Sequence, residues 1–272
     1  MDIIKSIILG IIEGVTEWLP ISSTGHLILA QEFLQFKNVG PGFWELFLVV
    51  VQLGAICAVL ITFLKKLNPF SAQKDIKEKK RTYRLWIKII IASLPAAVVG
   101  LILDKYMEKI ENALTVAITL TLYGILFIVL EIFNQKRQPT TTSLGGLTVK
   151  NALIIGACQM LALIPGTSRS GATILGAMLI GCSRYVAAEF SFFMAIPVMF
   201  GASLLKLVKY GFKFSGMEIA VLLFGMLTAF IVSVVAIKFL LGFIKKHDFK
   251  PFGYYRIVLG MIVFIYYLAS TR

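Results

Sequence analysis

Two carboxylic acids, Glu13 and Glu17, lie four residues apart in an apolar stretch near the start of the chain. That spacing puts both side chains on one face of a helix. At membrane depth each would cost about 2.5–3.5 kcal/mol on insertion scales, so the pair needs a shared proton, a cation or a buried arginine. The alternative is a helix end at the membrane interface, with both carboxylates solvated. We favour a buried pair because Pro20 and a Ser-Ser-Thr-Gly turn interrupt the stretch.

A hydroxyl-rich turn follows the carboxylates and reads Ser22-Ser23-Thr24-Gly25-His26. These hydroxyl groups can cap a helix that begins near His26. A helix N-terminus is also an anion site, because its free N–H groups and its dipole favour negative charge. A serine hydroxyl close to an imidazole has the geometry of a nucleophile and its base. A lone histidine is usually structural, but beside this cluster we favour a functional role for His26.

A second hydroxyl-rich break surrounds Arg169, the only lysine or arginine between Lys150 and Arg184. One alternative is that the side chain snorkels to a membrane interface. A phosphate clamp fits better, because the arginine stands among glycines and small hydroxyl residues, and guanidinium binds phosphate oxygens in bidentate fashion. Further hydroxyl donors would come from Ser168, Ser170 and Thr173.

Together the two breaks supply carboxylates, hydroxyls, an imidazole and a guanidinium, which suit a phosphate ester or anhydride. Glu13 and Glu17 would hold a divalent cation. Their hard oxygen ligands favour Mg²⁺ or Ca²⁺ over Zn²⁺. A polar site inside lipid would take a substrate with a polar head and an apolar tail.

The composition indicates that these breaks lie in a membrane. Of the 272 residues, 58% are hydrophobic and 15% are charged, whereas soluble domains are about 45–50% apolar and about 25% charged. These figures also exclude disordered, collagen-like and small disulfide-rich chains. A bilayer core needs roughly 20 apolar residues in a helix. Six runs predict spans: 46–64, 89–103, 113–130, 186–205, 219–237 and 257–269.

The loop charges predict which way these spans run. Lysine and arginine, 27 against 14 acids for a net charge of +13, collect on the cytoplasmic side of membrane proteins. The basic segments 65–88, 134–150 and 245–256 should therefore be cytoplasmic loops, while the segments 38–43 and 104–111 should be outer loops. Three lysines are exceptions that span counting places outside: Lys206, Lys209 and Lys213.

With these sides fixed, the interrupted stretches 3–34 and 153–181 cannot be ordinary spans. We predict that they are re-entrant hairpins, the first entering from outside and the second from inside. Each stretch carries a similar turn, in which a proline is followed by Ser-x-x-Gly, and each precedes three spans. The first span after each stretch has an embedded glutamate, Glu45 in the first copy and Glu189 in the second. An odd number of spans inverts the second copy, as in many transporters.

The predicted fold is therefore an all-α polytopic membrane protein with six transmembrane helices, two opposed re-entrant helical hairpins and an inverted-topology repeat. It forms one integral membrane domain, residues 1–272. Repeat one covers about 1–133, a cytoplasmic linker about 134–150 and repeat two about 151–272.

Both breaks resemble the undecaprenyl-diphosphate phosphatase family, the bacitracin-resistance type. The matching text is Glu13-Gly-x-Thr-Glu17-x-Leu-Pro-x-Ser-Ser-Thr-Gly-His26 and Pro165-Gly-x-Ser-Arg169-Ser-Gly-Ala-Thr173. The similarity covers essentially the whole chain. It implies hydrolysis of undecaprenyl diphosphate to undecaprenyl phosphate and inorganic phosphate, which recycles the lipid carrier of peptidoglycan synthesis and confers bacitracin resistance. It also implies divalent-cation dependence and a site open to the outer face of a bacterial inner membrane.

The resemblance also suggests roles for individual residues. Glu17 would be a base or a metal ligand, supported by Glu13. Ser23 would be the nucleophile or a phosphate ligand, His26 a proton-transfer partner and Arg169 the clamp on the diphosphate. The expected substrate-binding hydroxyl residues are Ser22, Thr24, Ser168, Ser170 and Thr173.

Three competing interpretations can be weighed on the sequence. The acid-phosphatase-like lipid phosphatases are excluded, because Leu175 and Phe190 stand where that class needs a histidine after Ser-Arg. A transporter that flips a polyprenyl phosphate is the strongest rival, although it has less use for paired carboxylates, serine and histidine together. A structural subunit has no use for the buried charges. The basic loops need no nucleic acid, since an anionic inner leaflet attracts them. The sequence leaves open whether the protein forms a homodimer.

Overall fold

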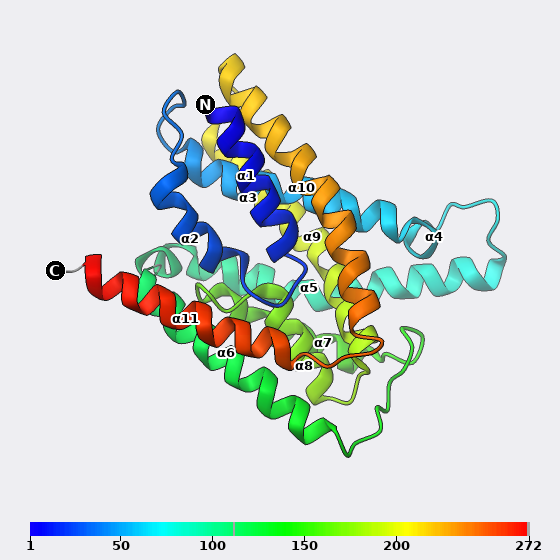
Figure 1. The fold of residues 1–272 in the computed structure, drawn as a ribbon. Helices are drawn as coiled ribbons and strands as arrows, with labels where there is room; N and C mark the ends of the chain where they lie inside the picture. The colour runs from blue at the N-terminus through cyan, green and yellow to red at the C-terminus, as the bar shows by residue number, and fades with distance from the viewer. Residues whose placement is uncertain (111, 271–272) are drawn as a thin grey trace.

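A computed structural model describes residues 1–110 and 112–270, and every regular element in those ranges is helical (Figure 1). The α-helices are α1 (Asp2–Thr16), α2 (Ser23–Leu34), α3 (Phe43–Thr62), α4 (Leu64–Leu67), α5 (Ile76–Ile110), α6 (Ala113–Asn134), α7 (Val149–Met160), α8 (Arg169–Leu179), α9 (Arg184–Tyr210), α10 (Gly216–Phe243) and α11 (Lys250–Ser270). A short 3₁₀ helix, η1 (Leu161–Leu163), follows α7.

Six of these helices are long and apolar enough to cross a membrane, and they coincide with the six predicted spans. They are Phe43–Thr62, Ile76–Leu103, Ala113–Asn134, Arg184–Tyr210, Gly216–Phe243 and Lys250–Ala269. The prediction of an all-α polytopic membrane protein is confirmed. The chain is a multi-pass membrane protein.

The predicted loop boundaries are wrong at three places. The basic segment 65–88 is mostly helix, since α5 begins at Ile76. The segment 104–111 continues α5 to Ile110, and residue 111 lies outside the described residues. The segment 245–256 is a loop only until α11 begins at Lys250, so Arg256 lies inside a helix. Lysine, arginine and glutamate form helices readily, so a charge run marks a membrane side without marking where a helix ends.

The two interrupted stretches are hairpins of short helices. The Asp2 carboxylate, at the start of α1, accepts hydrogen bonds from the backbone N–H (2.9 Å) and side-chain amide (3.0 Å) of Asn38, just after α2. The Gly181 carbonyl, just after α8, accepts from the backbone N–H of Thr140, before α7, at 2.9 Å. Each pair of helices therefore begins and ends at the same end of the molecule.

The open ends of the hairpins lie at opposite ends of the long helix α3. This helix begins at Phe43, just after the Asn38 contact, and leads to Lys66, which forms an ion pair with Glu189 near the start of α9. The second hairpin opens beside that same start of α9, next to Gly181. Entry of the hairpins from opposite membrane faces, and the inverted repeat itself, stay predictions. Glu45 lies exposed in the first turn of α3, whereas Glu189 is buried.

Each hairpin packs closely against one spanning helix. Helix α1 lies along α10, where a Cβ added to Gly10 would stand 2.6 Å from the carbonyl oxygen of Gly225 (Figure 1). Helix α7 lies along α5, where a Cβ on Gly156 would clash with the carbonyl oxygen of Ala92. A side chain at either position would clash with the neighbouring backbone, so glycine is what permits these helices to pack so closely. These contacts fix the short helices that carry the breaks.

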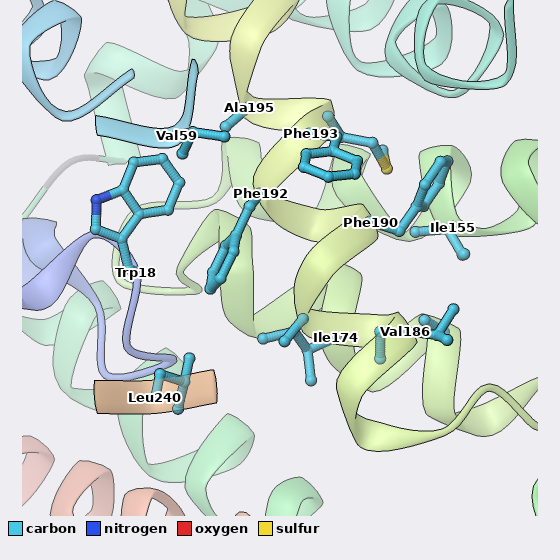
Figure 2. Packing of buried hydrophobic residues seen from close by; sticks show 14 of the residues in the cluster. Trp18, Val59, Ile155, Ile174, Val186, Phe190, Phe192, Phe193, Ala195 and Leu240 are labelled. Atoms are coloured by element: carbon cyan, nitrogen blue, oxygen red, sulfur yellow. The ribbon is translucent and has the colours of Figure 1, made fainter. Parts of the chain in front are cut away.

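The largest apolar cluster surrounds the first half of α9. Phe190, Phe192 and Phe193 are fully buried there, and Figure 2 shows their rings spreading from α9 toward different neighbouring helices. The Trp18 ring meets Phe192 edge to face, with ring centroids 5.2 Å apart. The first break is therefore packed against α9 one residue after Glu17.

Candidate active site

The two breaks share one backbone device. Ser22 precedes α2 and Ser168 precedes α8, and their φ angles of 74° and 72° are the two positive values among described residues other than glycine. Each Oγ accepts a hydrogen bond from the N–H three residues on, that of Gly25 at 3.3 Å and that of Gly171 at 3.2 Å. Such strained conformations persist only where the surroundings enforce them. The predicted serine cap is therefore confirmed, with α2 starting at Ser23.

The tips of the two hairpins meet at Glu17. Its Oε1 accepts from Arg169 Nη2 at 2.9 Å, and its Oε2 accepts from the Ser23 hydroxyl at 2.9 Å. Ser170 donates its hydroxyl to the Glu17 carbonyl oxygen at 3.0 Å. One carboxylate thus faces a hydroxyl of its own break and the guanidinium of the other.

Arg169 is held inside the molecule. Its side chain is 12% exposed, its Nη1 donates to the Ser191 carbonyl oxygen at 2.6 Å, and its guanidinium carbon lies 5.5 Å from the Trp18 ring centroid. The snorkelling alternative is therefore wrong. The Nε group has no partner in the part of the chain that the structure describes. Nε and Nη2 form the edge with which arginine binds two phosphate oxygens.

Glu13 lies one turn before Glu17 and is fully buried. Within the described residues neither of its carboxylate oxygens has a hydrogen-bond partner. The alternative of solvated carboxylates at an interface is therefore wrong. A buried carboxylate without a partner carries a large desolvation cost unless a proton or a cation compensates it.

A divalent cation fits these carboxylates. No group of three or more His, Cys, Asp or Glu occurs among the described residues, so the protein would supply the pair Glu13 and Glu17. Mg²⁺ is often bound by one or two carboxylates, with water and substrate phosphates completing its shell. The unpartnered oxygens of Glu13 are the observation that favours this arrangement.

His26 is oriented by two contacts. Its Nδ1 lies 2.7 Å from the Ser22 carbonyl oxygen, and its Nε2 lies 2.6 Å from the Tyr255 hydroxyl. Because a carbonyl only accepts, Nδ1 carries a proton. The rings of His26 and Tyr255 also stack, with centroids 5.6 Å apart. The base in contact with Ser23 is the Glu17 carboxylate, whereas the imidazole contacts Ser22 and Tyr255.

The predicted hydroxyl residues fall into two groups. Ser23, Thr24 and Ser168 are partly exposed, whereas Ser22, Ser170 and Thr173 are buried. The Thr173 hydroxyl contacts the Arg169 carbonyl oxygen at 2.9 Å and the Ser191 hydroxyl at 2.7 Å. The buried group therefore holds the backbone of the breaks, and the partly exposed group is accessible to a ligand.

Two residues of α11 belong to this region although the sequence did not single them out. Tyr255 orients His26, as described above. Arg256 is fully buried and donates to carbonyl oxygens in both breaks, those of Pro20, Gly166 and Thr167. Both stand in a segment that begins with lysines and was predicted to be a loop, so no sequence signal separated them from ordinary loop residues.

Comparison with known proteins defines the family. Residues 6–262 match the family described as bacitracin resistance protein BacA. The chain belongs to this family. The matched region contains every member of the candidate site, from Glu13 to Arg256.

Curated BacA-type relatives are similar over their whole length. A protein from Acetivibrio thermocellus named undecaprenyl-diphosphatase is 59% identical over 270 residues, covering 99% of both chains. Proteins of the same name are 58% identical over 270 residues in Enterococcus faecalis, covering 98% of both chains, and 55% identical over 273 residues in Desulfitobacterium hafniense, covering 100% of this chain and 98% of the relative.

Proposed function

We infer that this protein hydrolyses undecaprenyl diphosphate to undecaprenyl phosphate and inorganic phosphate. This activity recycles the lipid carrier of peptidoglycan synthesis and confers bacitracin resistance. Relatives more than half identical along the whole chain carry the name undecaprenyl-diphosphatase. The observation that carries the inference is the contact of the Glu17 carboxylate with both Ser23 and Arg169.

Arg169 binds the diphosphate. Its Nε is unpartnered, and Nη2 can exchange Glu17 for a phosphate oxygen. Ser23 and Ser170, in the first turns of α2 and α8, both bond to Glu17, and the N-terminus of each helix favours an anion through its free N–H groups and dipole. Partly exposed Thr24 and Ser168 add hydroxyl donors. A divalent cation, Mg²⁺ or Ca²⁺, held by Glu13 and Glu17 would neutralise further charge on the diphosphate.

Ser23 attacks the terminal phosphorus. Its hydroxyl already donates to Glu17 Oε2 at 2.9 Å, so Glu17 takes the proton as the oxygen attacks. The bond from the terminal phosphorus to the bridging oxygen breaks, and undecaprenyl phosphate leaves as an anion. Water then hydrolyses the phosphoserine, which releases inorganic phosphate and restores the hydroxyl. His26, oriented by Tyr255 at the more exposed edge, passes protons to and from solvent.

The surroundings suit a substrate with an apolar chain. An apolar cavity of about 760 Å³ lies between α5 and α9 beside Leu163, two residues before Pro165. The loop charges predict that the start of α9, where Lys66 pairs with Glu189, faces the cytoplasm. We propose that the site opens to the outer face of the bacterial inner membrane. Whether the protein forms a homodimer can be tested by cross-linking in membranes.

Phosphate release from undecaprenyl diphosphate tests the proposal. Purified protein in detergent with Mg²⁺ or Ca²⁺ should release phosphate, and Arg169→Ala should abolish release while remaining folded. Arg137→Ala is a matched control, because Arg137 stacks on Phe133 at the far end of α6. No release by the wild-type protein would contradict the proposal. It would favour the rival lipid transporter, which is tested by movement of a polyprenyl phosphate across vesicles.

A further inference from the structure

Arg256 is a buried cation whose hydrogen-bond partners are all backbone carbonyl groups. It lies on α11 with no exposed surface. Its Nη1 donates to the Pro20 carbonyl oxygen at 3.3 Å, and its Nη2 donates to those of Gly166 at 3.1 Å and Thr167 at 2.9 Å. A longer contact of 3.5 Å joins Nε to the Leu120 carbonyl oxygen on α6. No carboxylate pairs with Arg256 among the described residues.

The breaks explain why a guanidinium is needed here. Where a helix is interrupted at membrane depth, carbonyl groups lose their helical donors and need other ones. Arginine offers five N–H donors in a rigid plane, whereas lysine offers three from a single atom. Arg256 can therefore serve the carbonyls of two separate breaks at once. Thr119 on α6 supports the same region by donating its hydroxyl to the Pro165 carbonyl oxygen at 2.8 Å.

The carbonyls held by Arg256 flank the reacting groups. Pro20 stands midway between Glu17 and Ser23, and Thr167 stands two residues before Arg169. Helices α6 and α11, which carry Thr119 and Arg256, lie side by side under the tips (Figure 1). The guanidinium thus contacts the backbone of both tips.

We propose that Arg256, supported by Thr119, is a positioning residue that clamps the two breaks together and fixes the gap across which Glu17 meets Arg169. The proposal rests on the proposed hydrolysis, since the clamp acts through these reacting groups. Arg256 donates hydrogen bonds only to backbone carbonyl groups, and its guanidinium lies over the Tyr123 ring, 5.4 Å from the centroid. It therefore aligns the site without binding substrate.

Kinetics of Arg256→Lys test the clamp. Because misplacing reacting groups by about 1 Å can cost about 10²-fold in rate, we expect kcat to fall about 10²-fold and KM to stay within about threefold. Arg184→Lys is the matched control. Arg184 is a half-buried arginine at the start of α9, and it pairs with a carboxylate, Glu131, with Nη2 2.5 Å from Oε2. The Arg184→Lys variant should have a lower unfolding temperature and a kcat within about threefold of the wild-type value. Arg256→Lys with wild-type kcat, or with a kcat loss no larger than that of Arg184→Lys, would overturn the clamp.

A second pair of variants covers the case in which Arg256→Lys does not fold. Thr119→Val removes the bond to Pro165, and we expect kcat to fall about tenfold. Thr121→Val is its control on the same helix, because the Thr121 hydroxyl bonds within α6, to the Ala117 carbonyl oxygen at 2.9 Å. Equal kcat for the two threonine variants would overturn the proposal.

A distance measurement separates the clamp from the enzymatic activity. Spin labels on Phe33→Cys in α2 and Leu179→Cys in α8, both exposed positions, report the separation of the two hairpins once the native cysteines are replaced by alanine. The distance distribution should be narrow in the wild-type background and in Arg184→Lys, and should broaden in Arg256→Lys or Thr119→Val. Unchanged distributions would overturn the clamp even if the wild-type protein released no phosphate, an outcome that would contradict only the proposed function.

Discussion

The two helix breaks share a backbone frame and differ in chemistry. Ser22 and Ser168 adopt the same rare conformation, and each accepts from the N–H of a glycine three residues later. The first break adds carboxylates, and the second adds Arg169. The shared backbone conformation creates two helix N-termini that attract an anion. The two breaks differ in the groups they supply: the first supplies the base and the nucleophile, and the second supplies the arginine that would bind the diphosphate.

A second pair of equivalent positions shows the same contrast between the two hairpins. Glu13 and Gln159 stand at equal distances before the capping serines, and both are buried with side-chain oxygens that lack partners among the described residues. Only Glu13 can carry the charge that attracts a cation. The second position keeps polarity without charge, which indicates that a buried polar group alone does not make the site.

Replacing Arg169, which would bind the diphosphate, should have the largest effect. Arg169→Gln removes the cation that contacts Glu17 and that would bind the diphosphate, so we expect kcat/KM for phosphate release to fall about 10³-fold. Initial rates in detergent measure this, with Arg137→Gln as the control at the far end of α6. A loss of less than about tenfold would remove Arg169 from the clamp role.

Replacing Glu13 and Gln159 by leucine sharpens the contrast between the halves. Glu13→Leu should lower kcat about 10²-fold and abolish stimulation by Mg²⁺ or Ca²⁺. Gln159→Leu should keep kcat and stabilise the protein by about 1–2 kcal/mol, because an unpartnered buried amide is replaced by an apolar group of similar size. Phosphate release and thermal unfolding measure both effects. Equal activity of the two variants would show that Glu13 and Gln159 do not differ in their importance for catalysis.

Tyr255→Phe should have a smaller effect. It removes the hydroxyl 2.6 Å from His26 Nε2 and keeps the stacked ring, so we expect kcat to fall about fivefold, the equivalent of one hydrogen bond. Tyr254→Phe, at the exposed neighbouring position, should leave kcat unchanged. The two variants are compared by full kinetic profiles. Identical behaviour would show that His26 needs no orientation from α11.

Replacing the two capping serines should have the smallest effect, and the loss of stability should be equal for the two breaks. Ser22→Ala and Ser168→Ala each lose one cap hydrogen bond, and each should lower the free energy of unfolding by about 1 kcal/mol. Thermal unfolding in detergent should give the same decrease for both. A loss confined to one of the two serines would mean that the breaks are not equivalent in backbone energetics.

Much of the site could be predicted because its residues stand out against an apolar background. Glu13, Glu17 and Arg169 are charges inside segments of membrane character, and their cost at that depth marks them as functional. The six spans follow from hydropathy for the same reason. The sequence alone could not exclude solvated carboxylates or a snorkelling arginine, because a helix end and a helix break have similar sequences. The packing of the side chains in the structure decides between them.

Arg256 could not be predicted for a corresponding reason. It follows Lys245, Lys246 and Lys250, and in sequence it continues a basic segment. Burial of its side chain depends on how α11 packs on α6 and on where both breaks direct their carbonyl groups. Tyr255 is equally ordinary as a membrane-helix residue. Tertiary contacts across the whole chain length create these roles.

A double-mutant cycle between Glu17 and Arg169 tests most directly whether the two breaks form one site. Glu17→Gln, Arg169→Gln and the double variant are compared with the wild type for phosphate release from radiolabelled undecaprenyl diphosphate. Residues that act as a unit are strongly non-additive, so the double variant should be about as slow as the slower single variant. Losses that multiply, with the double variant slower by the product of the single effects, would contradict a single site built from both breaks.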